Sequence, residues 1–396
     1  MTRRWLLTWA LLTAVSVAIN LALRLHIVAE PWFLTRVLNN AILIVTLPGW
    51  IIVRLCSRVL GTPSSHLFAT ALGWGVFLVC VYLALRVRRA IMNIPSQTPD
   101  PGRRRFLFNA TATALVLPPS GVAAAAIAHQ PWSIRVARYT LTIRGFGRDM
   151  GEFRVVNVTD THLGTRIPAS FIERAYELAG SLEPDFAILT GDFLYNDISQ
   201  LQRSADLASQ FAVSARIASF GVLGNHDWYL NGPRMRDALT DAGVIMLDNT
   251  QRLVDLHTRT LTNDMTPTCL RFSGLGDLQT DQTLPGPALM VRAKGAPTIL
   301  LAHQPDTAEH GAVIGACRSG ARVDLQLAGH THGGQVWVPL FGTPVIPSRF
   351  GQKYAHGMVR GPQFPVLISA GIGMSILPVR WRVPPEVVLL TIDCCA

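Results

Sequence analysis

The chain has 396 residues, more than one average domain, and its 49% hydrophobic and 15% charged residues make it too apolar for an ordinary soluble protein. Residues 1–134 carry a net charge of +10, from 12 arginines against two acids, whereas the remainder has 23 basic and 23 acidic residues. A neutral remainder has no broad attraction for a polyanion. The charge therefore argues against nucleic acid as a partner and for arginines that flank membrane segments.

Three apolar segments come first, at residues 5–28, 32–55 and 66–85. Each has roughly 20 residues, about the length at which a helix crosses ~30 Å of hydrocarbon. The second segment carries Arg36 near its start and also fits a buried helix of a soluble domain. We expect residues 1–134 to form a membrane region with three or four transmembrane helices.

A fourth, weaker apolar segment follows Arg103, Arg104 and Arg105. It fits either an internal twin-arginine export signal or, as we favour, a fourth membrane helix with basic flanks. With four spans, the arginines between residues 86 and 105 lie in a cytoplasmic loop by the positive-inside rule. We then expect a multi-pass protein of a bacterial inner (cell) membrane whose C-terminal domain faces the periplasm or exterior. One span fewer would reverse the side.

From about residue 135 the pattern changes to that of a globular α/β domain, which we assign to residues 135–396. Short apolar runs predict buried strands at 153–158, 186–190, 220–223, 298–302 and 323–328. Between the first two strands, apolar residues recur at helical spacing behind Pro168. Strand, helix and strand together predict a βαβ unit.

Side chains suited to metal binding follow all five strands. In chain order they are Asp160 and His162; Asp192; Asn225, His226 and Asp227; His303; and His330 and His332. In an open α/β sheet, ligands bind beyond the carboxyl ends of the strands, so we expect these clusters to converge. Carboxylates with imidazoles suit Mn, Fe or Zn, and Asp192 is the natural bridge between two ions. Gly191, Gly224, Gly329 and Gly333 are expected to permit the tight turns.

Together these motifs resemble the calcineurin-like metallophosphoesterase superfamily over about residues 150–392. The resemblance implies a four-layer αββα sandwich and metal-dependent hydrolysis of phosphate esters at two divalent ions. It implies that Asp160, His162, Asp192 and His332 hold one ion, and that Asp192, Asn225, His303 and His330 hold the other. It also implies that His226 acts as an unligated imidazole in the chemistry and that Asp227 orients it.

Further motifs, at residues 333–336, 353–357 and 371–386, are similar to a bacterial branch of membrane-associated or exported phosphodiesterases; the segment around Pro378 departs from that pattern. An enzymatic alternative is a lipid-linked nucleotide pyrophosphatase of the UDP-diacylglucosamine type. A non-enzymatic alternative is a metal-binding membrane sensor module. The expected partners are a phosphate-ester substrate, which includes lipid-linked esters, and the membrane; the sequence indicates no protein partner.

Several residues keep two interpretations. Asp197 fits either a loop acid or a support for the metal site, and Arg166 fits either a phosphate contact or an exposed arginine. His356 fits the rim of the site. The six cysteines have no metal-ligand spacing and are expected to be unpaired thiols.

Overall fold

The structure is a computed structural model that describes residues 129–143, 146, 150–164, 166–290, 295–338, 342–375 and 379–394. The described residues belong to one compact unit that extends from Gly121 to Ala396. Within those ranges, no helix is both long enough and apolar enough to cross a membrane. The apolar segments predicted as membrane helices lie outside the described residues.

The first sheet has six strands in the order β1–β15–β2–β4–β6–β7. Their bounds are β1 Arg135–Thr142, β2 Glu152–Val158, β4 Phe186–Leu189, β6 Ala218–Gly221, β7 Ile245–Met246 and β15 Glu386–Asp393. Strands β2, β4 and β6 pair in parallel, with Val155 opposite Phe186 and Phe186 opposite Ala218. Strand β15 is antiparallel to β2 and parallel to β1, so the end of the domain is inserted beside its beginning.

The second sheet has seven strands in the order β13–β14–β12–β11–β10–β8–β9. Their bounds are β8 Gln251–Asp255, β9 Thr260–Thr262, β10 Cys269–Gly274, β11 Thr298–Leu301, β12 Leu325–Ala328, β13 Gly357–Arg360 and β14 Pro365–Ile368. Two further short strands, β3 Leu163–Gly164 and β5 Leu194–Tyr195, form a separate parallel pair.

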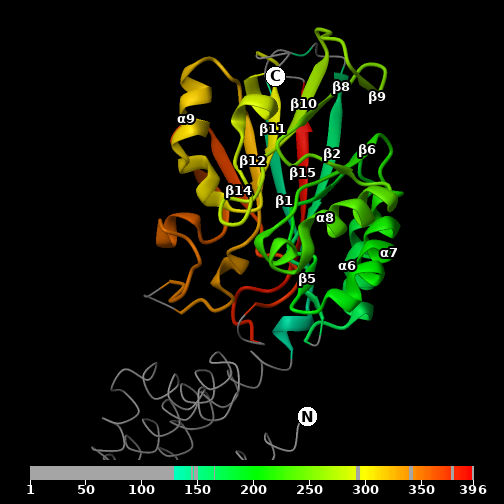
Figure 1. Ribbon diagram of the computed structural model, residues 1–396, viewed down its shortest axis with the longest axis vertical. Coiled ribbons are helices and arrows are strands. Elements are labelled where there is room, and N and C mark those ends of the chain that lie inside the picture. Colours follow the sequence, from blue (N-terminus) through cyan, green and yellow to red (C-terminus); the bar gives the residue numbers. More distant parts are fainter. Residues whose placement is uncertain are drawn as a thin grey trace, which may run out of the picture. The chain divides into compact units, whose positions relative to one another are not determined.

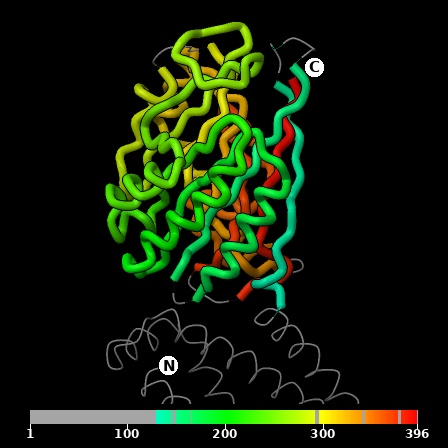
Figure 2. Tube along the Cα trace, turned by 90° about the vertical axis from the view of Figure 1, so that its right-hand side faces the viewer, coloured from blue at the N-terminus to red at the C-terminus, as the bar shows by residue number. Residues whose placement is uncertain are grey.

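The α-helices are α6 Ala169–Gly180, α7 Leu201–Ala212, α8 Asn225–Asp241 and α9 Gly311–Arg318. Short helices are η1 Gln130–Trp132, η3 Ile198–Gln200, η4 Gly286–Met290, η5 Pro305–Glu309, η6 His332–Gly334 and η7 Gly351–Tyr354. Figure 1 shows α6, α7 and α8 beside one sheet and α9 on the far side of the other. In Figure 2 the molecule is turned so that α6, α7 and α8 face the viewer.

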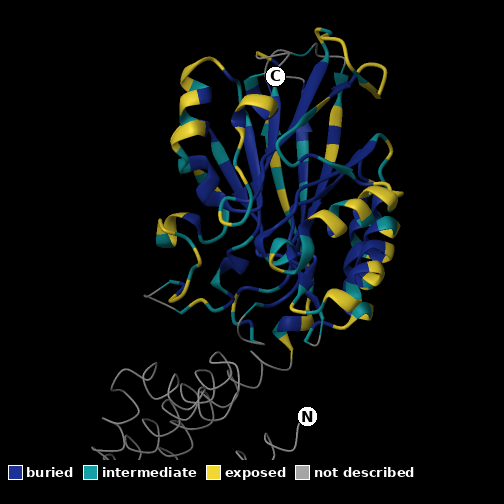
Figure 3. Ribbon diagram, viewed as in Figure 1, coloured by how far each residue is buried: buried dark blue, intermediate teal, exposed yellow. Residues whose placement is uncertain are grey.

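Three apolar cores separate these layers. One lies between the first sheet and α6 to α8, one lies between the two sheets, and one lies between the second sheet and α9. Figure 3 shows the strands buried between partly exposed helices. The order helix, sheet, sheet, helix confirms the mixed α/β fold that the sequence predicted.

The predicted βαβ unit is β2, α6 and β4, and α6 begins directly after Pro168 as expected. Each predicted strand lies within two residues of an observed one. The bounds of β2, β4, β11 and β12 differ from the prediction at one end only, whereas β6 is displaced by two residues at both ends. The predicted strands also divide between sheets: β2, β4 and β6 lie in the first, and β11 and β12 in the second. The polar clusters therefore do not follow the strands of one open sheet.

Candidate metal centre

Residues from both sheets meet where their parallel strands end. Three groups of side chains each bring ligand atoms to within 4.8 Å of one another: Asp160, His162 and His332; His162, Asp192 and His226; and Asp192, His303 and His330. The two sheets share a core, and the groups combine side chains that follow β2 and β4 of the first sheet with side chains that follow β11 and β12 of the second, so these strand ends lie together. This packing brings together side chains that are as far as 172 positions apart in the chain.

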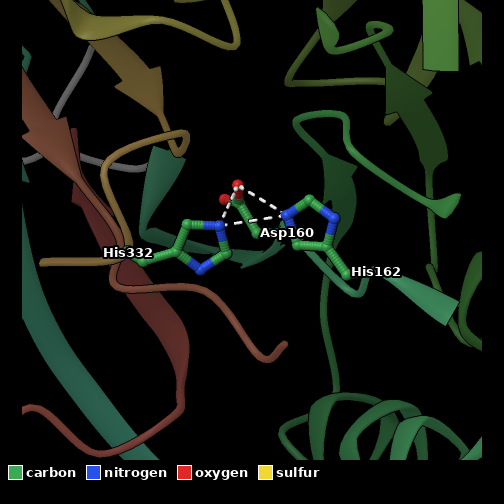
Figure 4. A group of neighbouring side chains, drawn as sticks. All are labelled: Asp160, His162 and His332. Atoms are coloured by element: carbon green, nitrogen blue, oxygen red, sulfur yellow. Dashed lines mark hydrogen bonds and ion pairs between the residues drawn. The ribbon is translucent and has the colours of Figure 1, made fainter. Parts of the chain in front are cut away.

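The first group is drawn in Figure 4. The Nε2 atoms of His162 and His332 face each other at 3.0 Å, and the Asp160 Oδ1 atom lies 3.4 Å from His332 Nε2 and 3.8 Å from His162 Nε2. All three side chains are buried. Two imidazole nitrogens that point at one spot beside a carboxylate form a donor set suited to a divalent cation.

Asp192 joins this group to the next. Its Oδ2 atom lies 3.5 Å from His162 Nε2 and 3.2 Å from His303 Nε2. The Nδ1 atom of His303 lies 2.7 Å from the Thr190 carbonyl oxygen, a contact that sets the ring so that Nε2 faces the carboxylate. Asn225 Oδ1 and His330 Nε2 are buried and have no hydrogen-bond partner among the described residues. Such unpaired buried atoms are expected of groups that bind a metal ion.

The backbone around these residues is unusual. Five non-glycine residues of the cluster lie in the left-handed region: Asp160 (φ 54°), His162 (φ 49°), Asp192 (φ 57°), His330 (φ 68°) and His332 (φ 51°). A left-handed non-glycine residue costs on the order of 1 kcal/mol or more, and such residues gather at functional sites. The tertiary structure therefore holds these side chains in place at the expense of stability.

Two glycines allow the chain segments to approach closely. Gly191 has φ 91°, and a Cβ atom there would lie 2.5 Å from the Gly224 nitrogen and 2.9 Å from His303 Nδ1. A Cβ atom on Gly329 would overlap the Asp160 carboxylate. At Gly191 glycine permits the left-handed backbone of a turn, as predicted. At Gly329 glycine is needed because a side chain would collide with the Asp160 carboxylate.

The Asp227 carboxylate binds backbone N–H groups around the site. Its two carboxylate oxygens accept the backbone N–H groups of Asp192, Phe193, Leu194 and Gly224, at 2.8 to 3.3 Å. Asp227 therefore caps α8 and fastens the loop that carries Asp192, and in the described part of the chain it makes no hydrogen bond to the His226 ring. The orientation of His226 by Asp227, which the family resemblance implies, stays a prediction, and it would act through the first turn of α8, where both residues lie.

The His226 ring is held by other rings. Tyr195 stacks on it at 5.3 Å between centroids, and His162 and Tyr229 meet it edge to face at 4.8 and 5.6 Å. Its backbone N–H donates to Asp192 Oδ1 at 2.9 Å. The imidazole thus lies against the metal-binding groups in a fixed orientation.

Burial controls the ionisation of the cluster. It lowers the pKa of His162 and of His330 to about 3, so both rings are neutral and keep a lone pair for a metal. Burial also raises the pKa of Asp160 to about 7, helped by the nearby charge of Asp192. For Asp192 the effect of burial is outweighed by the charge of His303, which keeps its pKa well below the usual value. Buried carboxylates this close together favour a cation between them.

Comparison with known proteins agrees with this geometry. The calcineurin-like phosphoesterase family model matches residues 153–334. Residues 153–334 form a calcineurin-like metallophosphoesterase domain. The chain is 29% identical to Phosphodiesterase YaeI of Escherichia coli over 73% of this chain and 98% of that protein. It is 25% identical to the uncharacterized metallophosphoesterase YkuE of Bacillus subtilis over 73% of this chain and 97% of that protein.

A third relative is a transmembrane protein with metallophosphoesterase domain from Danio rerio, 26% identical over 62% of this chain and 54% of that protein. A dimetal phosphatase structure from the same organism covers 56% of this chain and 88% of that chain, at 12% identity and a TM-score of 0.37. The family match and these relatives show that the chain is a metallophosphoesterase, a metal-dependent hydrolase of phosphate esters.

The metallophosphoesterase domain also contains supports that the sequence did not reveal. The loop at residues 370–373 lies against the Asp160 turn, where Ile372 N donates to Thr159 O at 3.0 Å and Gly373 N donates to Asp160 O at 2.6 Å. Arg380 is fully buried and donates to the carbonyl oxygens of Ala370, Gly371, Gly373 and Val383. Arg380 belongs to the segment that departs from the pattern of the bacterial branch, and it fastens the loop beneath Asp160, which forms the floor of the site.

The residues left undecided now have contacts. Asp197 caps η3 by accepting the N–H of Ser199 at 3.0 Å, so it is a loop acid. The Arg166 guanidinium lies 5.2 Å above the Tyr195 ring. His356 Nε2 lies 2.9 Å from Glu386 Oε1 and does not belong to the metal-binding groups of the described residues. Tyr195, three positions after Asp192, is a ring contact of His226 that the sequence analysis missed.

Proposed function

We propose that the chain hydrolyses phosphodiesters at a centre of two divalent metal ions and that residues 1–134 tether it to a membrane. The position of Asp192 carries the proposal, because this carboxylate belongs to two of the three candidate metal-binding groups. A carboxylate shared by two sites is the arrangement that holds two ions close together. The name of the relative YaeI, a phosphodiesterase, supports diesters as the substrate class.

The residues divide into two sets in this proposal. Asp160, His162, Asp192 and His332 would hold one ion, and Asp192, Asn225, His303 and His330 would hold the other. When bound, the ions neutralise charge on the phosphoryl oxygens and activate water for attack on phosphorus. The neutral imidazoles and the unpaired oxygen of Asn225 fit these positions.

His226 is the group that we assign to proton transfer. Its ring lies against His162 and Tyr195 at the cluster, where it can donate a proton to the departing ester oxygen. Replacement His226→Ala should lower turnover of a diester with a poor leaving group by about 100-fold or more while metal content is unchanged. Wild-type turnover of that substrate by the variant would contradict the assignment.

The direct test of the function uses the full-length chain purified in detergent with its metals quantified. We expect two metal equivalents and turnover of phosphodiesters in preference to monoesters and lipid-linked pyrophosphates. Preference for a lipid-linked nucleotide pyrophosphate would support the pyrophosphatase alternative. Bound metal without turnover of any of these would support a sensor module.

The membrane part of the proposal rests on the three apolar segments and on the arginines that flank them. The Danio rerio relative, by its name a transmembrane protein, is consistent with such a region. We propose a multi-pass protein of a bacterial inner membrane whose catalytic domain faces the periplasm or exterior. Reporter fusions after Arg89 and at the C-terminus test the topology, and a cytoplasmic C-terminus would refute it.

A further inference from the structure

A cavity of about 760 Å³ adjoins the candidate metal centre and shares His330 with it. Its other walls come from η5 and the following turn, from residues 346–350, and from residues 278–279. Polar and charged side chains of the lining include Gln304, Asp306, Glu309, His310 and Arg349. The cavity is far larger than a phosphate group and has the size of a pocket for a small organic molecule.

The walls of this cavity are tied together by hydrogen bonds. Asp306 on η5 accepts the Ser348 hydroxyl at 2.6 Å and the Arg349 backbone N–H at 2.9 Å. Glu309, also on η5, accepts the Tyr354 hydroxyl at 2.7 Å and forms an ion pair with Lys353. Both acids thus hold the segment 348–354 against η5 and fix this wall of the cavity.

Two residues that line the cavity carry a buried polar atom that has no partner in the described part of the chain. Gln304 is 2% exposed, and its side-chain Nε2 makes no hydrogen bond there. The Nδ1 atom of His310 is likewise buried without a partner. An unpaired buried polar group costs on the order of 1–3 kcal/mol. Rotation of either side chain towards the cavity would bring its unpaired atom to a ligand that can hydrogen-bond to it.

The charges around the cavity narrow the class of ligand. Two carboxylates, Asp306 and Glu309, lie on one wall and the exposed Arg349 lies on another. A second anionic group would meet those carboxylates, and an acyl chain would leave the Gln304 amide unpaired. A neutral group rich in hydroxyls avoids repulsion by the carboxylates and can also pair with the Gln304 amide, because each hydroxyl both donates and accepts hydrogen bonds.

We infer that this cavity binds a neutral, hydroxyl-bearing group of the substrate, such as a pentose or a glycerol, while the attached phosphate lies at the metal centre. The inference rests on the proposed phosphodiesterase function. It makes Gln304, His310 and Arg349 determinants of specificity. A nucleoside and a glycerol headgroup share the required chemistry, and the experiment separates them.

The test compares three esters that all release p-nitrophenol: bis(p-nitrophenyl) phosphate, thymidine 5′-p-nitrophenyl phosphate and glycerol p-nitrophenyl phosphate. For Gln304→Leu, we expect the kcat/KM ratio of at least one hydroxylated ester to the bis(p-nitrophenyl) ester to fall about tenfold. The matched control Gln202→Leu, in which the lost amide bonds Asp206 on the outer helix α7, should keep both wild-type ratios. Arg349→Ala, at an exposed position, should lower the same ratio about threefold and serves if Gln304→Leu does not fold.

The two hydroxylated esters identify the ligand. A fall confined to the thymidine ester assigns a nucleoside, a fall confined to the glycerol ester assigns a headgroup, and a fall for both assigns the shared hydroxyl chemistry. Wild-type ratios in both variants would overturn the inference.

A binding measurement separates this inference from the proposed function. Calorimetric titration with thymidine monophosphate, glycerol 3-phosphate and inorganic phosphate needs no turnover. Binding of either organic phosphate should weaken about tenfold in Gln304→Leu relative to inorganic phosphate. Equal weakening or none would refute the pocket even in an active enzyme, whereas weakening without any turnover would contradict only the proposed function.

Discussion

The layer between the two sheets and the edge where their strands end are built from the same strands by opposite physical rules. Between the sheets, Phe272 packs against Phe186 and Phe220 with ring centroids 4.6 and 4.7 Å apart, inside a cluster of buried hydrophobic side chains. At the edge, buried carboxylates and imidazoles lie within ion-pair distance on left-handed backbone. Burial of apolar surface in the core stabilises the fold, and this stability offsets the cost of the strained backbone and the buried charges at the edge.

The largest expected effect is loss of activity at the edge with little loss of stability. Replacement Asp192→Asn should lower kcat/KM at least 1,000-fold, because a neutral amide cannot bridge two cations. Asparagine tolerates the left-handed backbone and keeps an oxygen for the His226 N–H, so the fold should survive. Turnover, metal content and thermal unfolding test this. The control Asp197→Asn should retain activity, and equal loss in both variants would place the effect outside the metal centre.

The core should show the reverse pattern. Replacement Phe272→Ala removes a fully buried ring between the sheets and should lower the free energy of unfolding by about 3–5 kcal/mol. Denaturant unfolding measures the loss, and the folded fraction should still bind metal. Leu261→Ala, at a position 44% exposed on β9, is the matched control and should cost less than about 1 kcal/mol. Similar losses in both would contradict the inter-sheet core.

Arg380 should couple the two regions. Replacement Arg380→Met removes a donor from four carbonyl oxygens of the site floor, of which, among the described residues, only that of Gly371 also accepts another N–H, from Glu386. It should lower the free energy of unfolding by about 2–3 kcal/mol. Because the floor holds the Asp160 backbone, metal affinity should also fall. Chemical unfolding and metal titration measure the two effects. Unchanged metal affinity would mean that Arg380 serves stability alone.

Glu386 provides the smallest expected effect, and it depends on pH. Burial opposes its ionisation, but the hydrogen bonds from His356 and Ala370 and the charges of His356 and Arg135 lower its pKa to about 2, from the ordinary 4.5. Because the pKa is lowered on folding, the stabilisation is complete above pH of about 4.5 and is lost as the pH falls towards 2. Between pH 7 and pH 3, about 2 kcal/mol of this stabilisation should be lost.

Thermal unfolding from pH 7 to pH 3 tests that expectation. The difference between the wild type and Glu386→Gln should shrink as the pH falls. Glu183→Gln is the control, since the Glu183 side chain is 64% exposed and its surface ion pairs contribute little. A constant difference between wild type and Glu386→Gln over the range would contradict the linkage.

Local patterns predicted those parts of the fold that depend on neighbouring residues. Apolar runs located β2, β4, β11 and β12, and helical spacing behind Pro168 located α6. The displaced strand β6 shows where this fails. Val222 and Leu223 are apolar and buried, as a strand would be, yet the ladder with β4 ends at Gly221. Burial alone does not mark a strand end, because hydrogen-bond pairing sets it.

The sequence by itself determined the residue types of the candidate metal site and the family. Five clusters of side chains suited to metal binding follow five predicted strands in order, and this combination identifies the family, whereas any one cluster would be a weak signal. Tertiary structure decided the rest. It placed β15 beside β1 and β2, brought Arg380 under Asp160, turned Asp227 to the loop amides and formed the cavity beside His330. Each of these depends on contacts between distant segments, and no local pattern of side chains encodes which buried donor will meet which acceptor.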